Sequence, residues 1–155
     1  MSDLVGKELI DFELPYVGEK GLEKVQLSSV AKDKNVLLLF FPAAWTGVCT
    51  KEVCTVRDSL AEYSNMNAEV YGISVDMPWA LDKFKKDQNL NYKLLSDANK
   101  SVIKAYDVVW PDLAGIQDTA RRSAFVIKGG KISYQWVCNS QGDFPPFDEI
   151  KAQLK

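Results

Sequence analysis

An unbroken apolar run from Val36 to Phe41 constrains the fold of this chain more than any other stretch. A run of this length, rich in leucine and phenylalanine, is typical of a strand that is buried on both faces. Beyond it, apolar residues recur at the spacing of one helix face, at Val53, Val56, Leu60 and Tyr63. The sequence therefore predicts a central strand and a following helix, joined by a short loop that contains Pro42.

Cys49 stands at the start of this helix, four residues before Val53, so it begins the buried face and lies in the first turn. The first N–H groups of a helix lack partners and carry about half a positive charge. A thiolate is favoured there over a thiol, and the thiolate is the nucleophile. Thr46 is expected as the N-cap or as a hydroxyl directed at the same pocket, and Pro42 fixes the loop backbone. This position indicates a reactive thiolate; a small buried hydrophobe is the alternative.

The middle of the chain alternates between strand and helix. Residues 68–75 read as a second buried strand and Leu94–Leu95 as a short third one. Asp76 is expected to cap the helix between them, with Pro78 in its first turn, and Asp97 to cap a helix over Lys100–Tyr106. Such alternation predicts parallel strands joined by crossover helices.

The two ends of the chain differ from the middle. Lys7–Ile10 and Phe12–Leu14 read as an edge strand or extended arm that ends at Pro15, and Ser28–Ser29 as a turn. Near the other end, two β-rich runs flank Lys128-Gly129-Gly130, a hairpin pattern, and Pro146 opens a final helix over 147–154. We predict one α/β domain over residues 1–155, with a mixed central sheet and helices on both faces, as in a thioredoxin-like fold.

Charge and composition exclude several classes of function. A net charge of −2 gives no electrostatic basis for binding nucleic acid or membranes, and no apolar run approaches the length of a membrane span. The absence of histidine excludes Cys–His and Ser–His–Asp nucleophile systems and disfavours zinc or haem. Three cysteines and no signal-peptide pattern at Met1–Gly6 lead us to expect a cytoplasmic protein that keeps its thiols for reactivity.

The pattern Pro42-x-x-x-Thr46-x-x-Cys49 resembles the active-site motif of peroxiredoxins, the thiol peroxidases. Further segments similar to that family follow in the expected order: Cys49-Thr50-x-Glu52, Arg57-Asp58, Val70–Ser74, Leu94–Asp97 and Arg122–Ile127. The resemblance covers the chain from about Gly6 onward. Cys54, five residues after Cys49, is similar to the second cysteine of the bacterioferritin-comigratory, or PrxQ, branch. Gly47 and Val48 depart from that branch, which often has Pro and Gly there.

The resemblance implies a reaction and a set of partners. The Cys49 thiolate would attack hydrogen peroxide or an alkyl hydroperoxide and become a sulfenic acid, with Thr46 and Arg122 orienting the peroxide. Cys54 would resolve the sulfenic acid, and thioredoxin or a similar dithiol protein would supply electrons. No metal, flavin or haem is implied, and the branch is often monomeric or dimeric. Phe41 and Trp45 are expected to wall the pocket.

Three charged residues need separate interpretation. Arg122 stands just before the buried run 124–127. This position is compatible with a surface arginine or with a cation in the pocket at one end of the sheet. The resemblance favours the pocket for Arg122 and implies that Arg121 lies at the surface. Arg57 lies about two helical turns after Cys49 and resembles a pocket-supporting arginine, with an ion pair to Asp58 or Glu52 as the alternative. Glu52 is expected to pair with a cation or a substrate hydrogen, because a carboxylate against the thiolate would oppose its ionisation.

Two other functions fit this sequence less well: a thiol–disulfide oxidoreductase and a non-enzymatic binding module. A thiol–disulfide oxidoreductase acting on proteins normally has Cys-x-x-Cys, whereas four residues separate Cys49 and Cys54 here. A non-enzymatic binding module would leave Thr46 and Arg122 unexplained.

Five residues along an intact helix place two Cα atoms roughly 8–9 Å apart, beyond the ~7 Å limit for a disulfide. Either the first turns of the helix unwind after oxidation, or Cys54 is not the partner and Cys138 is its competitor. We predict a Cys49–Cys54 disulfide with local loss of helix.

Overall fold

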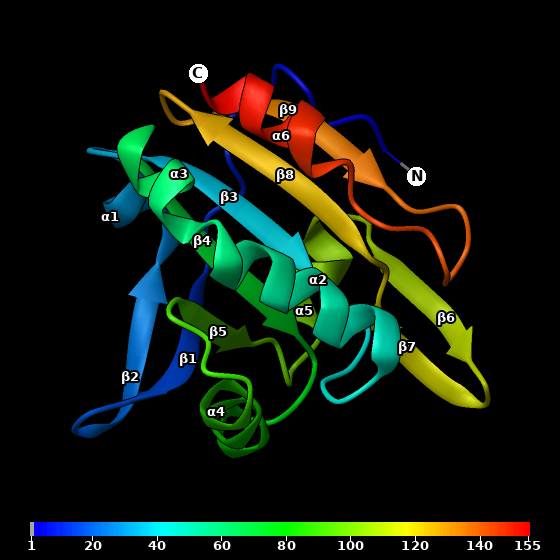
Figure 1. Ribbon diagram of the computed structural model, residues 1–155. Helices are drawn as coiled ribbons and strands as arrows, with labels where there is room; N and C mark the ends of the chain where they lie inside the picture. The colour runs from blue at the N-terminus through cyan, green and yellow to red at the C-terminus, as the bar shows by residue number, and fades with distance from the viewer. Residues whose placement is uncertain (1) are drawn as a thin grey trace.

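The computed structural model describes residues 2–155, and its main element is a five-stranded sheet in the order β5-β4-β3-β8-β9 (Figure 1). Strands β3 (Asn35–Phe40), β4 (Ala68–Ser74) and β5 (Lys93–Ser96) run parallel to one another. On the other side of β3, β8 (Ser123–Lys128) pairs antiparallel to it, and β9 (Lys131–Val137) pairs antiparallel to β8. The mixed sheet predicted from the sequence is therefore confirmed.

The central strand β3 is covered on both faces, which explains its continuous apolar sequence. All six side chains from Val36 to Phe41 are fully buried. Val36, Leu38 and Phe40 face a core formed with α1 (Leu27–Ala31) and α5 (Ser101–Ala105). Leu37, Leu39 and Phe41 face the opposite core, which is closed by four helices: α2 (Gly47–Asp58), α3 (Leu60–Asn65), α4 (Pro78–Asp87) and α6 (Phe147–Leu154). Figure 1 shows α2 and α3 crossing the face of the sheet turned toward the viewer.

Two hairpins lie outside the main sheet. In the first, β1 (Glu13–Gly18) pairs with β2 (Gly21–Gln26), so the prediction that the strand ends at Pro15 is wrong. The missing N–H of proline is tolerated there because the ribbon has only two strands. The predicted turn at Ser28–Ser29 is also wrong, since both residues lie in α1.

The second hairpin pairs β6 (Val109–Leu113) with β7 (Ile116–Ala120), and the sequence reasoning did not anticipate it. The chain reverses at Ala114 and Gly115, whose φ angles are 51° and 91°. Both residues thus adopt the left-handed conformation that a tight hairpin turn requires. Most side chains of β6 and β7 are exposed or half-buried, only Thr119 and Ala120 at the end of β7 are buried, and burial does not alternate along either strand, which leaves little periodicity to recognise.

Two details of the helices differ from the prediction. The helix that begins near Cys49 stops at Asp58, because Ser59 has φ −122° and ψ 19°, and α3 starts afresh at Leu60. Asp76 does not cap α4, whose N-cap is Met77. Its carboxylate instead accepts hydrogen bonds from Ala44 N (2.9 Å) and Ser74 Oγ (2.7 Å). Asp76 therefore ties the loop that follows β3 to the end of β4.

Three other local predictions are confirmed. Gly129 and Gly130 form the tight turn between β8 and β9, with φ angles of 59° and 76°. The carboxylate of Asp97 accepts hydrogen bonds from the N–H groups of Val102 and Ile103 at the start of α5. Pro146 immediately precedes α6. Across the described residues, no helix has the length and apolar character that crossing a bilayer would require.

Candidate active site

Cys49 is the third residue of α2 and is only 1% exposed. Val53 and Val56, on the same face of the helix, pack into the core against Leu37 and Leu39 of β3. That packing fixes the N-terminus of α2 at the carboxyl end of β3. The first intrahelical hydrogen bond runs from Thr50 N to Thr46 O, so the N–H groups of residues 47–49 have no acceptor within the helix.

Arg122 brings a permanent positive charge to Cys49. It immediately precedes β8, and the pairing of Ser123 with Phe40 places it at the end of the sheet where α2 begins. Its Nη1 atom donates hydrogen bonds to Cys49 Sγ (3.2 Å) and to Glu52 Oε1 (2.8 Å), and Nη2 donates to Gln141 O (3.4 Å). The arginine is 3% exposed, so these contacts form in a nearly dry environment.

Glu52 shares this arginine with the thiol. Its side chain is fully buried, and burial raises its pKa to about 7 against the opposing effect of Arg122. Within the described residues its Oε2 atom has no hydrogen-bond partner, which is why desolvation outweighs the ion pair. Burial acts against the charge of Arg122, but Glu52 and Cys49 outweigh it, so the arginine pKa is raised and the guanidinium stays charged. Arg122 therefore remains a cation in contact with both Glu52 and Cys49.

The loop before α2 carries Pro42, Trp45 and Thr46. Thr46 directly precedes the helix as predicted, but its hydroxyl does not cap an N–H group; it donates to Ala43 O (3.0 Å). Trp45 was expected to wall the pocket, yet it is 50% exposed and its ring packs on Phe84 of α4 with a centroid distance of 5.2 Å. Pro42 is buried in the loop. Phe41 is fully buried in the same core as Cys49.

Arg57 and Cys54 lie together, away from the Arg122 cluster. Arg57 Nε pairs with Asp58 Oδ1 (2.9 Å) and its Nη1 donates to Gln88 O, so the ion pair named as the alternative is the one formed. Cys54 is half-buried, and its Sγ lies 3.5 Å from Gln88 Oε1. The sequence reasoning missed Gln88 because it belongs to a separate loop, and no motif marks it.

Cys138 and Arg121 occupy the neighbouring turn. Cys138 is 2% exposed, its N–H donates to Arg122 O (2.9 Å), and burial raises the pKa of its thiol. Arg121 donates from Nε to Cys138 O (2.8 Å) and lies over the ring of Trp110 at 4.9 Å. It is half-buried rather than a free surface residue. All three cysteines of the chain are free thiols in this structure.

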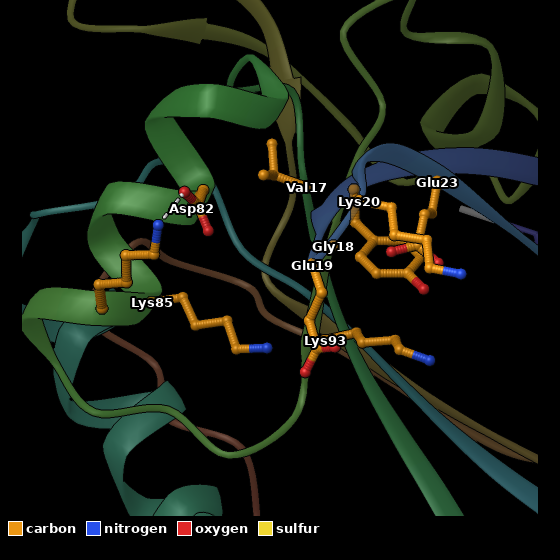
Figure 2. A pocket seen from close by; sticks show the side chains of 10 residues that line it. Val17, Gly18, Glu19, Lys20, Glu23, Asp82, Lys85 and Lys93 are labelled. Carbon is orange, nitrogen blue, oxygen red and sulfur yellow. Dashed lines mark hydrogen bonds and ion pairs between the residues drawn. The ribbon is translucent and has the colours of Figure 1, made fainter.

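A cavity of about 660 Å³ lies apart from these thiols, between the β1–β2 hairpin and α4 (Figure 2). Lys85 and Lys93 line it together with Glu19 and Asp82. Burial, reinforced by the nearby charge of Lys93, lowers the pKa of Lys85. None of the residues predicted for the thiol site lines this cavity.

The fold and the site together define a class. A thioredoxin-like sheet whose central strand leads into a helix with an arginine-bound cysteine in its first turn is the arrangement of a thiol-based redox protein. Comparison with known proteins identifies the family. The model of the AhpC/TSA family matches residues 5–135, and peroxiredoxin Bcp of Bacillus subtilis is 34% identical over 144 residues, or 88% of this chain and 86% of that protein. The chain belongs to the AhpC/TSA family, and this Bacillus relative is a peroxiredoxin.

Two further relatives place the chain within that family. The chloroplastic 2-Cys peroxiredoxin BAS1 of spinach is 35% identical over 98% of this chain, which spans 58% of the spinach protein's length. The crystal structure of peroxidoxin BcpB from Mycobacterium tuberculosis superposes with a TM-score of 0.86 and 33% identity, covering 99% of this chain and 97% of that one. The resemblance to Bcp-type peroxiredoxins seen in the sequence is thereby confirmed.

Proposed function

We propose that this chain is a cysteine-based peroxidase that reduces hydrogen peroxide or alkyl hydroperoxides. The observation that carries the proposal is the 3.2 Å contact between Arg122 Nη1 and Cys49 Sγ at the N-terminus of α2. A buried guanidinium and unpaired helix N–H groups both favour the thiolate, which is the reactive form. Membership of the AhpC/TSA family supports the same chemistry.

In the first step, the Cys49 thiolate attacks the terminal oxygen of the hydroperoxide. The S–O bond forms as the O–O bond breaks, and the leaving alkoxide or hydroxide takes up a proton, which gives an alcohol or water and a sulfenic acid. Arg122 and the N–H groups at the start of α2 stabilise the negative charge that develops on oxygen. The Thr46 hydroxyl donates to Ala43 O, so its lone pairs remain available to accept a hydrogen bond from the peroxide.

In the second step, the Cys54 thiolate attacks Cys49 sulfur, an S–S bond forms, and hydroxide leaves and is protonated to water. Both cysteines lie on the intact helix α2, so this step requires the helix to open between them. Thioredoxin or a similar dithiol protein then reduces the disulfide. The three free thiols support a reducing compartment such as the cytoplasm. We propose that the protein acts as a monomer or homodimer.

Peroxide consumption with dithiothreitol as reductant tests the proposal. Wild-type protein and Cys138→Ser should consume hydrogen peroxide, and Cys49→Ser should not, while its circular dichroism spectrum stays that of the wild type. Insulin reduction without peroxide turnover would instead identify a protein disulfide reductase. Retained peroxide consumption in Cys49→Ser would overturn the mechanism.

A further inference from the structure

The loop between α4 and β5, residues 88–92, is fastened to helix α2 close to Cys54. The hydroxyl of Tyr92 donates a hydrogen bond to Val53 O at 2.7 Å, and the tyrosine is 6% exposed. Val53 is the residue immediately before Cys54 and lies in the segment that separates the two cysteines. Tyr92 therefore holds a carbonyl of the turn that must open before a Cys49–Cys54 bond can form.

The same loop contacts α2 at three further points. The Cys54 thiol donates to Gln88 Oε1 (3.5 Å), and Arg57 Nη1 donates to Gln88 O. Asn91 Nδ2 donates to Arg57 O (3.3 Å). Gln88 at one end of the loop and Asn91 and Tyr92 at the other are thus hydrogen-bonded to residues 53, 54 and 57 of the helix.

The Tyr92 bond resists opening because its donor is buried. Unwinding α2 at Val53 removes the acceptor, and a buried hydroxyl without a partner is costly. Burial, with the nearby charge of Glu52 adding to it, raises the pKa of Tyr92 well above its ordinary value. The hydroxyl therefore remains a hydrogen-bond donor across the pH range in which the protein would work.

We propose that Tyr92 is a positioning residue that holds the Cys54 turn of α2 closed and thereby sets the rate at which a sulfenic acid at Cys49 becomes a disulfide. This inference rests on the proposed peroxidase function. The sulfenate has two fates that compete. Cys54 can displace hydroxide from it to form the disulfide, or a second hydroperoxide can transfer one oxygen atom to it, giving a sulfinic acid and an alcohol or water.

The test compares Tyr92→Phe with Tyr63→Phe. Tyr63 is an apt control because it is fully buried and its hydroxyl has no hydrogen-bond partner in the described part of the chain. After a pulse of hydrogen peroxide, the protein is quenched with acid and an alkylating reagent, and its peptides are quantified by mass spectrometry. Tyr92→Phe should form the disulfide about three- to tenfold faster, the factor that corresponds to one net hydrogen bond, and should accumulate less sulfinic acid. The initial loss of the Cys49 thiol should be equally fast in both variants.

A second measurement needs no peroxide. In the reduced Cys49→Ser background, alkylation of Cys54 under native conditions reports opening of its turn directly. Tyr92→Phe should raise the alkylation rate by the same three- to tenfold, Gln88→Ala should raise it as well, and Tyr63→Phe should leave it unchanged. If the wild-type protein fails to react with peroxide, the proposed function falls and this measurement alone decides the role of Tyr92.

Two results would overturn the inference. One is Cys54 alkylation in Tyr92→Phe that matches Tyr63→Phe. The other, in a protein that does react with peroxide, is an unchanged rate of disulfide formation in Tyr92→Phe. Urea unfolding of each variant measures its global free energy of unfolding. Where that free energy stays high, unfolded chains are too few to account for faster alkylation or disulfide formation, so the faster rate reflects local opening.

Discussion

Glu52 and Arg122 form a 2.8 Å ion pair in which neither side chain is more than 3% exposed. The pair sits directly against the thiol, since the same Nη1 atom also contacts Cys49 Sγ. Removing one partner from a buried pair is strongly destabilising, because it leaves an uncompensated charge. Substitutions in this cluster therefore need to keep a polar atom at the position that they change.

The first prediction concerns pH and stability. The pKa of Glu52 is raised from 4.5 to about 7, so the native state holds this proton more tightly than the unfolded state. The protonated Glu52 stabilises the native state fully below about pH 4.5, and this stabilisation is lost as the pH rises through about 7. The free energy of unfolding should thereby fall by about 3 kcal/mol. Glu52→Gln keeps an oxygen for Arg122 and should become more stable relative to wild type at pH 8 than at pH 5. Urea unfolding at both pH values measures this.

The control for that measurement is Glu62→Gln. Glu62 is 59% exposed in its pair with Lys151, so the effect of its substitution on the free energy of unfolding should be small. An equal effect of Glu52→Gln at pH 5 and pH 8 would contradict the prediction.

The second prediction separates the two adjacent arginines. Arg122→Lys keeps the charge but loses the planar fork of donors that reaches Cys49 and Glu52 together. We expect both Cys49 alkylation at pH 7 and peroxide reduction to slow about tenfold or more, the range for a hydrogen bond to a charged group. Arg121→Lys should change both rates much less than Arg122→Lys does, because Arg121 contacts Cys138 O and the ring of Trp110 and not Cys49. Equal effects of the two variants would show that Arg122 does not tune the thiol.

The third prediction concerns the oxidised protein. Treatment with one equivalent of peroxide should give an intramolecular Cys49–Cys54 disulfide and a loss of helical circular dichroism, because the bond cannot form on intact α2. Peptide mass mapping locates the bond. Cys54→Ser should keep its helical signal under the same treatment. A bond from Cys49 to Cys138 would exclude this cycle.

The fourth prediction tests how the loop before α2 is held. Asp76→Ala removes the acceptor of Ala44 N and Ser74 Oγ, and Ala44 is 7% exposed. We expect a loss of about 1–3 kcal/mol in the free energy of unfolding, the cost of a buried donor left without a partner. Asp87→Ala, which breaks a surface pair with Lys83, should cost about 0.5 kcal/mol. Asp76→Asn should retain most of the stability.

Features encoded locally were predictable from the sequence. The run Val36–Phe41 specifies a strand, and the four-residue spacing from Cys49 to Val53 places the thiol in the first turn of its helix. Arg57 was harder to place, because eight residues at 100° each leave it about 80° around the helix from Cys49. It consequently faces Gln88 and Asp58.

Features that depend on distant partners could not be predicted in this way. Asp76 has the local signature of a helix cap, but its acceptor oxygen is taken by Ala44, 32 residues earlier. Tyr92 contacts Val53 across 39 residues, and no periodicity encodes that pairing. Which of Arg121 and Arg122 points inward depends on the register of β8 against β3, and only the family motif indicated it beforehand.

The position of Trp45 should make the tryptophan fluorescence of the protein depend on its redox state. Its indole packs on Phe84 although its φ of 75° lies in the left-handed region, which is costly for a bulky residue, so this contact holds it in place. Trp45 precedes Cys49 by four residues and is already 50% exposed, so we expect unwinding at the start of α2 to release its ring from Phe84 and expose it further. Oxidation should then shift the tryptophan emission toward longer wavelength, and Trp45→Phe should abolish the shift even though Trp79, Trp110 and Trp136 remain. The redox state of the unlabelled protein would thus be visible in its own fluorescence.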